Sequence, residues 1–265
     1  MGKQWKAPPV YFVIAQVRFS PVLDLASYVA KIQEDFRRAD FTDFKKVMNA
    51  SFNLGMLATL KPGDVPPMQQ SERYLFSNEN GTEMFILDPN GLTFQTTEYK
   101  TFEVLTRTFL PRMENLTNTL SLSFSDRVGL RYLDAVIPAP GETVESYLIP
   151  QVLGAREKVS GEMQYSFTEA LFNVPQGKLL SRVVIQNGPV GFPPDLAMLG
   201  CNFKLGERFS AHKEGQYGII DTDGFNDTRG RVDTDTIREK IESLHKEVHA
   251  VFHSIITNHA EKMWS

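Results

Sequence analysis

Residues 125–138, SDRVGLRYLDAVIP, form the densest strand-like run of the sequence and lie at its middle. Side chains alternate between the two faces of a strand, which separates the apolar positions of this run from its charged ones. One face carries Val128, Leu130 and Tyr132. The other face carries Arg127, Gly129 and Arg131. The run therefore predicts a strand with one apolar face and one face that presents two arginines.

A second run near the N-terminus repeats this pattern. Residues 10–21, VYFVIAQVRFSP, are also rich in apolar side chains, and Arg18-Phe19 matches the Arg131-Tyr132 pair of the middle run. Each run then meets a proline and a segment with helical spacing. The repetition predicts a fold built from two related halves.

The first half contains two segments whose apolar residues recur at helical spacing, over 24–38 and 99–114. Strands are predicted over 10–19, 49–60, 73–77, 82–87 and 92–97, with Asn-Gly pairs that favour tight hairpins between the last three. Residues 61–70, KPGDVPPMQQ, are predicted to be a loop because proline and glycine interrupt regular structure.

The second half has a similar order of elements. Strands are predicted over 163–174 and 178–187 and again within 200–221, the last of them ending in 217–223, YGIIDTD. Helices are predicted over 142–153 and 233–261. The apolar stripe expected on the final helix is Leu244, Val248, Val251 and Ile255.

These elements give each half the order strand, helix, three or four strands, helix. Strands joined by short hairpins run antiparallel, and helices segregated to one face of such a sheet make an α+β structure. We therefore predict an α+β fold with two related halves, residues 1–122 and 123–265, that together form one compact unit.

The composition limits the functions that fit this chain. With 265 residues, 42% hydrophobic and 23% charged, the sequence is typical of a soluble globular protein. A net charge of -4 does not favour general affinity for nucleic acid. The single cysteine, Cys201, excludes an intrachain disulfide and a multi-cysteine zinc site. No apolar run reaches the roughly 18 residues of a membrane span, so we expect a cytoplasmic protein without a membrane partner.

Three passages carry a resemblance to a protein family. They are residues 7–22, APPVYFVIAQVRFSPV, residues 126–138, DRVGLRYLDAVIP, and residues 217–223, YGIIDTD, with the helix that follows. The chain resembles an uncharacterised, sporadically distributed prokaryotic family of similar length. The resemblance supplies no activity, substrate or catalytic residue. The patchy occurrence of that family is typical of mobile or defence-associated genes, so the resemblance implies an antiviral or toxin-neutralising context.

The last predicted helix carries His245, His249 and His253 at four-residue spacing, at which two histidines could share a metal ion. However, Lys246 stands where the zinc-protease pattern requires glutamate. We therefore interpret these residues as core or boundary histidines. The sequence also lacks a phosphate loop and a nucleophile elbow, and we predict no catalytic residue, no metal site and no cofactor.

Two further features are interpreted as structural. Residues 221–233, DTDGFNDTRGRVD, resemble a calcium loop, but Phe225 occupies the fifth position and the terminal glutamate is missing. A hairpin or the entrance to a helix is the favoured interpretation. Cys201 is interpreted as a small core residue.

The arginines of the two matching runs are the remaining candidates. Arg127 and Arg131 on one strand face could bind a phosphate or a carboxylate through paired hydrogen bonds. Alternatively, each is held by an acid of a neighbouring strand. We expect Arg131 to face the layer between sheet and helices, where an unpaired charge is costly, and therefore to pair with Asp221 or Asp223. The candidate ligand-binding residues are thus Arg18, Arg127, Arg131, Asp221 and Asp223.

The leading functional prediction is a non-enzymatic binding or adaptor protein that recognises a protein partner, and a homo-oligomer stays open. One alternative is a nucleic-acid-binding protein that presents Arg18, Arg127, Arg131 and Arg182 on a single exposed face of the sheet. The other alternative is an enzyme whose site is assembled from dispersed residues.

Overall fold

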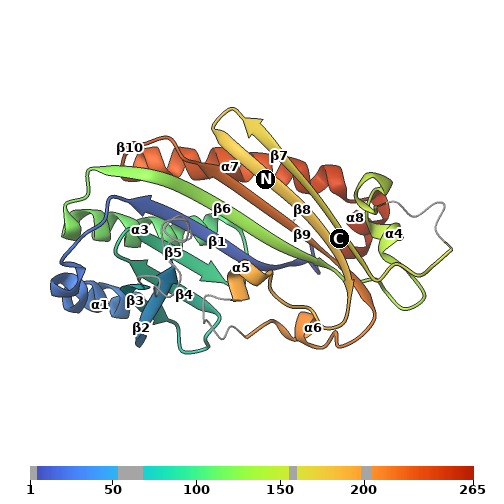
Figure 1. Cartoon of the computed structure of the whole chain (residues 1–265), viewed down its shortest axis with the longest axis horizontal. Coiled ribbons are helices and arrows are strands. Elements are labelled where there is room, and N and C mark those ends of the chain that lie inside the picture. Colours follow the sequence, from blue (N-terminus) through green and yellow to red (C-terminus); the bar gives the residue numbers. More distant parts are fainter. Residues whose placement is uncertain (1–4, 53–67, 155–159, 198–203) are drawn as a thin grey trace, which may run out of the picture.

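One large antiparallel sheet runs through the computed structural model, which describes residues 5–52, 68–154, 160–197 and 204–265 (Figure 1). The sheet has 10 strands in the order β2-β3-β4-β5-β1-β6-β9-β8-β7, and β10 also pairs with β6. The strands are β1 (Val10–Phe19), β2 (Asp43–Phe52), β3 (Met68–Ser77), β4 (Glu83–Asp88), β5 (Gly91–Thr96), β6 (Phe124–Val136), β7 (Tyr165–Val174), β8 (Gly177–Asn187), β9 (Gln216–Asn226) and β10 (Gly230–Arg231).

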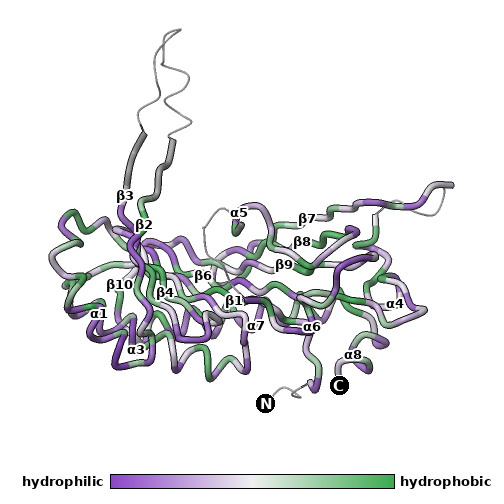
Figure 2. Tube along the Cα trace, turned by 90° about the horizontal axis from the view of Figure 1, so that it is seen from below, coloured by the Kyte–Doolittle hydropathy of each residue, from purple (hydrophilic) through white to green (hydrophobic). Residues whose placement is uncertain are grey.

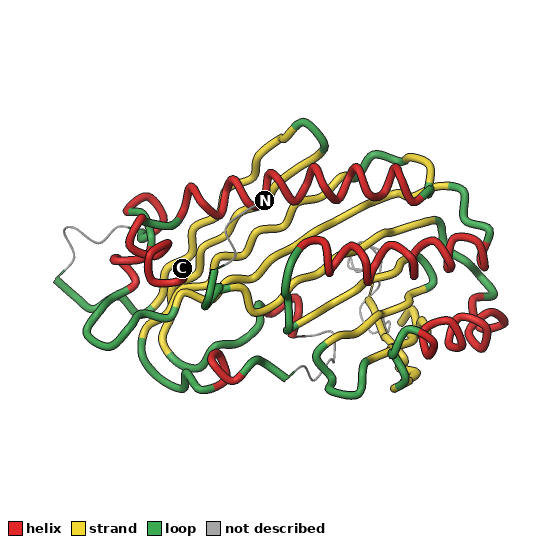
Figure 3. The backbone as a smooth tube through the Cα atoms, turned by 180° about the vertical axis from the view of Figure 1, so that it is seen from behind, coloured by secondary structure: helices red, strands yellow, loops and turns green. Residues whose placement is uncertain are grey.

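The three long helices lie on one face of this sheet, as Figure 3 shows. They are α1 (Val29–Arg38), α3 (Phe102–Leu120) and α7 (Thr234–Ile255). The shorter helical elements are η1 (Leu25–Tyr28), α4 (Val144–Tyr147), η2 (Pro150–Val152), α5 (Pro194–Ala197), α6 (Glu207–Ser210) and α8 (Asn258–Trp264). α5 stands on the side of the sheet opposite α1 and α3 (Figure 2). The predicted fold class is confirmed, because the helices pack against a large antiparallel sheet.

The two strands of the quoted runs are neighbours at the centre of the sheet. β1 pairs with β6 from Val10↔Asp134 to Phe19↔Ser125, antiparallel throughout. β5 pairs with the other edge of β1, and β9 pairs with the other edge of β6. Each of these outer strands lies ahead of a long helix in the chain, β5 ahead of α3 and β9 ahead of α7. The predicted boundary at residues 122 and 123 falls between α3 and β6.

The face toward the long helices holds the main core. β1 and β6 supply alternate apolar residues to it, such as Val17 and Val128, both fully buried. Phe36 of α1 stacks on Phe76 of β3 with ring centroids 4.5 Å apart, and Phe109 of α3 packs in the same core. The apolar face predicted for the central run is therefore its helix-covered face.

The opposite face is covered at one end only. There the chain between β8 and β9 supplies Val190 and Phe209, which pack on Tyr11 of β1 and on Tyr217 of β9. The Tyr11 hydroxyl donates a hydrogen bond of 2.9 Å to the carbonyl of Gly191. The other end of this face keeps polar side chains, and this is where a hollow forms.

The bounds predicted for several elements of the first half were wrong. β2 begins at Asp43, not at residue 49, and residues 53–60 of the predicted strand lie outside the described residues. β3 begins at Met68, inside the predicted loop, of which residues 61–67 are not described. α3 passes its predicted end and continues to Leu120. β2 and β3 pair with each other along their whole length, and this pairing stabilises both strands.

In the second half, the structure has two short elements, α4 and η2, in place of the predicted helix over 142–153. Extended backbone at Ile149, which precedes Pro150, separates them, since the residue before proline is driven away from helical angles. Between 204 and 221 the described chain contains α6 and the start of β9 instead of several strands. The last helix ends at Ile255, because Ile256 is extended and bridges to Leu148.

The buried stripe of α7 differs from the predicted one at a single position. Leu244, Val248 and Ile255 are buried as predicted. Phe252 is buried as well, whereas Val251 is only partly buried at the edge of the core. The stripe therefore passes through Phe252.

Candidate functional site

A polar hollow of about 250 Å³ lies on the face of the sheet that the long helices leave open. It spans β1, β3, β4, β5, β6 and β9, and α5 stands at its side. Side chains alternate along each strand, so the polar residues of these strands gather here while their apolar neighbours enter the core. The polar lining residues are Gln16, Arg18, Arg73, Asp88, Asn90, Thr93, Gln95, Arg127, Arg131, Asp195 and Asp223.

Arg131 makes the strongest ion pairs in the hollow. Its Nε and Nη2 donate to the two carboxylate oxygens of Asp221, each at 2.7 Å, and its Nη1 donates to Asp195 at 2.5 Å. Burial alone would lower the pKa of Arg131, but these hydrogen bonds and charges raise it above its usual value. The predicted pairing of Arg131 with Asp221 is confirmed. However, Arg131 faces the open side of the sheet and not the helix layer in which we expected it.

Arg182 of β8 belongs to the same network. Its Nη1 donates to Asp221 at 3.2 Å, and its Nε donates to Glu169 of β7 at 2.8 Å. Asp221 is 2% exposed and thus holds two arginines in a nearly dry environment. The charges and hydrogen-bond donors of this network are satisfied within it, so we interpret Arg131, Arg182 and Asp221 as structural residues.

Arg127 is held less completely. Its Nη2 lies 3.4 Å from Asp223, its guanidinium lies over the Phe225 ring at 4.1 Å, and its buried Nε has no hydrogen-bond partner among the described residues. Burial lowers the pKa of Arg127; Asp223 opposes this shift, and the positive charge of Arg18 adds to it. Arg127 therefore retains hydrogen-bonding capacity for a ligand.

Among the arginines of the hollow, Arg18 is the one most accessible to a ligand. It is exposed and makes no ion pair with the described residues, although it lies opposite Arg127 in the β1–β6 register. On its other side it faces Gly91 of β5, which has no side chain to cover it. Arg73, by contrast, is paired with Asp88 at 2.8 Å. The free positive charge of this face is therefore concentrated at Arg18 and Arg127.

The floor of the hollow adds uncharged polar groups. Gln16 donates through Nε2 to the Thr93 hydroxyl at 2.9 Å. Gln95 is 1% exposed, and its Oε1 is buried without a hydrogen-bond partner among the described residues. A buried acceptor left without a donor costs about 1–3 kcal/mol, so this side chain favours a ligand that brings a donor.

The five candidate residues of the sequence thus lie together, but with different roles. Arg18, Arg127, Arg131 and Asp223 line the hollow, and Asp221 holds Arg131 from beneath. Sequence reasoning missed Gln95, although the alternation of Thr93 and Gln95 with buried Leu92 and Phe94 was a usable signal. It also missed Asp195 of α5, which follows two prolines and carries no such signal.

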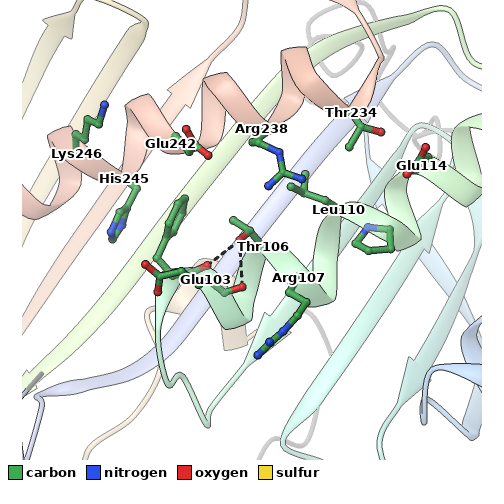
Figure 4. Close-up of a pocket in the computed structure, with 12 residues that line it drawn as sticks. Glu103, Thr106, Arg107, Leu110, Glu114, Thr234, Arg238, Glu242, His245 and Lys246 are labelled. Atoms are coloured by element: carbon green, nitrogen blue, oxygen red, sulfur yellow. Dashed lines mark hydrogen bonds between the residues drawn. The ribbon is translucent and has the colours of Figure 1, made fainter. Parts of the chain in front are cut away.

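A larger hollow of about 630 Å³ lies on the helix side, between α3 and α7 (Figure 4). Acidic and basic side chains of both helices alternate around it, among them Glu103, Arg107, Arg238 and Glu242. At its end the His245 ring stacks on Phe102 with centroids 4.0 Å apart. Mixed charges on two neighbouring helices are typical of a solvated seam, and we do not assign it as the binding site.

No group of three or more His, Cys, Asp and Glu side chains that could enclose a metal ion occurs within the described residues. Residues 221–226 of the run that resembles a calcium loop continue β9 to Asn226, and the end of the run is the entrance to α7, where Asp233 caps the helix by accepting a hydrogen bond from the backbone N–H of Thr236. The interpretation as a helix entrance is therefore confirmed for this end. The role predicted for Cys201 falls outside the described residues.

Comparison with protein-family models, with curated proteins and with solved structures found no match. The family resemblance of the three passages therefore stays a prediction. Among the helices that the structure describes, none is long and apolar enough to cross a membrane.

Proposed function

We propose that this protein is a non-enzymatic binding protein that recognises an acidic segment of a protein partner in the open hollow of the sheet. The observation that carries the proposal is the juxtaposition of Arg18 and Arg127, two arginines in register on adjacent strands, of which only Arg127 contacts a carboxylate, that of Asp223 at 3.4 Å. A guanidinium binds a carboxylate through two parallel hydrogen bonds, which suits an Asp or Glu side chain.

The balance of charge favours an acidic peptide over nucleic acid. All four arginines that the nucleic-acid alternative requires lie on the face that the long helices leave open. Three of them, Arg127, Arg131 and Arg182, contact carboxylates on that face. Binding of a nucleic-acid backbone needs positive charge along an extended path, and the net charge of -4 opposes it further.

The size of the hollow also favours an acidic peptide over nucleic acid. About 250 Å³ admits one or two side chains of an extended peptide but no duplex. The buried Oε1 of Gln95 would accept a hydrogen bond from a backbone or side-chain N–H of that peptide. The partner thus combines a carboxylate with a neighbouring donor.

A selection from a random-peptide display library on the immobilised protein tests this proposal. We expect the selected peptides to be enriched in Asp and Glu and to lose binding to Arg18→Ala and Arg127→Ala. Arg107→Ala, on the helix side of the sheet, is the matched control and should bind like the wild type. Selected peptides without acidic residues, or equal binding by the Arg18 and Arg127 variants, would overturn the proposal.

The same variants also test whether the hollow binds nucleic acid instead of a peptide. Single-stranded and double-stranded oligonucleotides are titrated into the same variants at several salt concentrations. Binding that depends on Arg18 and weakens steeply with salt would replace the acidic peptide by a nucleic-acid backbone. The defence-related context implied by the family resemblance rests on no structural feature and stays a prediction.

A further inference from the structure

Two histidines on the exposed side of α7 point their ring nitrogens at each other. His249 and His253 stand one turn apart, and their Nε2 atoms are 3.1 Å apart. The two rings lie with centroids 4.3 Å apart. His249 is exposed, and the His253 side chain is 32% exposed, so the space beside both nitrogens is reachable from solvent.

This separation matches two nitrogens bound to one metal ion. Imidazole nitrogens bind zinc at about 2.0–2.1 Å. Two such nitrogens lie about 3.4 Å apart at a tetrahedral angle and about 2.9 Å apart at a right angle. The observed 3.1 Å falls between these values. An ion can therefore take the place of the proton that the two Nε2 atoms share, without a change of rotamer.

A carboxylate supports one of the two rings from behind. The Nδ1 of His253 lies 2.9 Å from Oε1 of Glu261 on α8. A metal-binding histidine is commonly oriented by such a carboxylate on its other nitrogen, which fixes the tautomer and leaves the Nε2 lone pair free. Trp5 packs against the same ring with centroids 5.7 Å apart, which restrains it from another side.

We propose that His249 and His253 bind a late first-row divalent ion, Zn²⁺ or Ni²⁺, through their Nε2 atoms, with Glu261 as the residue that orients His253. Binding moves the His249 proton from Nε2 to Nδ1, so that both neutral rings present an Nε2 lone pair to the ion. Since no third His, Cys, Asp or Glu completes a cluster in the described part of the chain, the other coordination positions face solvent and take water. This proposal revises our interpretation of the histidines as boundary residues and is independent of the hollow on the other face.

The tryptophans of the chain make the site directly measurable. The sequence has 2 Trp, and Trp5 and Trp264 lie together with centroids 5.5 Å apart, next to His253. Titration of Ni²⁺ into the untagged, metal-free protein should quench tryptophan emission with a saturable curve. Zn²⁺, which does not quench, should restore the emission by competition. A single-site curve is expected.

Four variants test the assignment. His249→Gln and His253→Gln should abolish the saturable quenching, and Glu261→Gln should weaken it about tenfold. His259→Gln is the control, because His259 contacts Glu142 and not this pair. His249→Gln is the decisive variant, since an exposed side chain leaves the packing of α7 intact, which the metal-free emission and circular dichroism verify. Unchanged quenching in His249→Gln, no saturable quenching in the wild type, or an equal loss in His259→Gln would each overturn the proposal.

Discussion

Arg18 of β1 lies directly opposite Arg127 of β6, at the seam where the two halves of the sheet meet. Like charges at directly opposed positions of an antiparallel pair destabilise it by roughly 0.2–1 kcal/mol. Asp223 contacts only Arg127 of the two, at 3.4 Å. The fold therefore keeps a repulsion that a bound anion would remove, and this links the stability of the seam to the function that we propose.

Replacement of Arg18 by alanine should stabilise the free protein slightly, by at most about 1 kcal/mol, because it removes this repulsion. Urea unfolding at low salt measures the effect. In high salt the difference between Arg18→Ala and the wild type should shrink, since salt screens exposed charges. A clear loss of stability in Arg18→Ala would show that Arg18 is a structural residue and would contradict our assignment.

Replacement of Arg131 by alanine should have the opposite effect. It leaves Asp221, which is 2% exposed, with only the longer contact to Arg182, and breaking such a buried pair costs roughly 3 kcal/mol. In a double-mutant cycle, Arg131→Ala with Asp221→Ala should cost less than the two single changes summed. Arg38→Ala, whose side chain is 75% exposed in a helix-surface pair with Glu34, is the matched control and should change little. A melting temperature unchanged in Arg131→Ala would make Arg131 a recognition residue instead.

Alternation along the strands was enough to predict the centre of this structure. It placed Val128, Leu130 and Tyr132 in the core and Arg127 and Arg131 on the other face. Alternation does not tell which of the two faces the helices cover, and for this reason we expected Arg131 in the helix layer.

Features that depend on contacts between residues far apart in the chain could not be predicted from the sequence. β2 has few residues with strand preference and forms through its pairing with β3. Asp195 reaches Arg131 only because the chain between β8 and β9 folds back over the sheet. The pairing of Arg131 with Asp221 was predictable, because both positions alternate with buried apolar residues in adjacent strands.

Val248 of α7 should be far more sensitive to a charge than its neighbour Val251. Val248 is 3% exposed and packs close to Gly224, where an added Cβ would lie 3.2 Å from its Cγ2. Val248→Asp should therefore cost several kcal/mol, as an unpaired charge in a core does. Val251→Asp, at the partly buried edge, should cost clearly less. Denaturant unfolding of both variants checks the order, and equal losses would place Val251 in the core stripe.

The last prediction concerns Asp134 of β6, on the helix side of the sheet. Asp134 is 6% exposed, and no hydrogen bond or ion pair from the described residues reaches its carboxyl. Burial raises the pKa of Asp134 to about 8. An unfolded aspartate has a pKa near 3.9. Between these two values the unfolded chain releases a proton that the folded chain retains, so the free energy of unfolding falls as the pH rises, by up to about 1.4 kcal/mol per pH unit.

Replacement of Asp134 by asparagine, which cannot ionise, should remove this dependence. Urea unfolding of both proteins between about pH 6 and about pH 7.5 gives the two slopes, which should differ by about 1 kcal/mol per pH unit. His245, whose pKa burial and the charge of His249 lower to about 4, contributes a slope of the opposite sign as the pH falls below about 6.5. Both proteins contain His245, so its contribution cancels in the difference. Parallel slopes for wild type and Asp134→Asn would mean that Asp134 is ionised in the folded protein, and then a positive group must reach it.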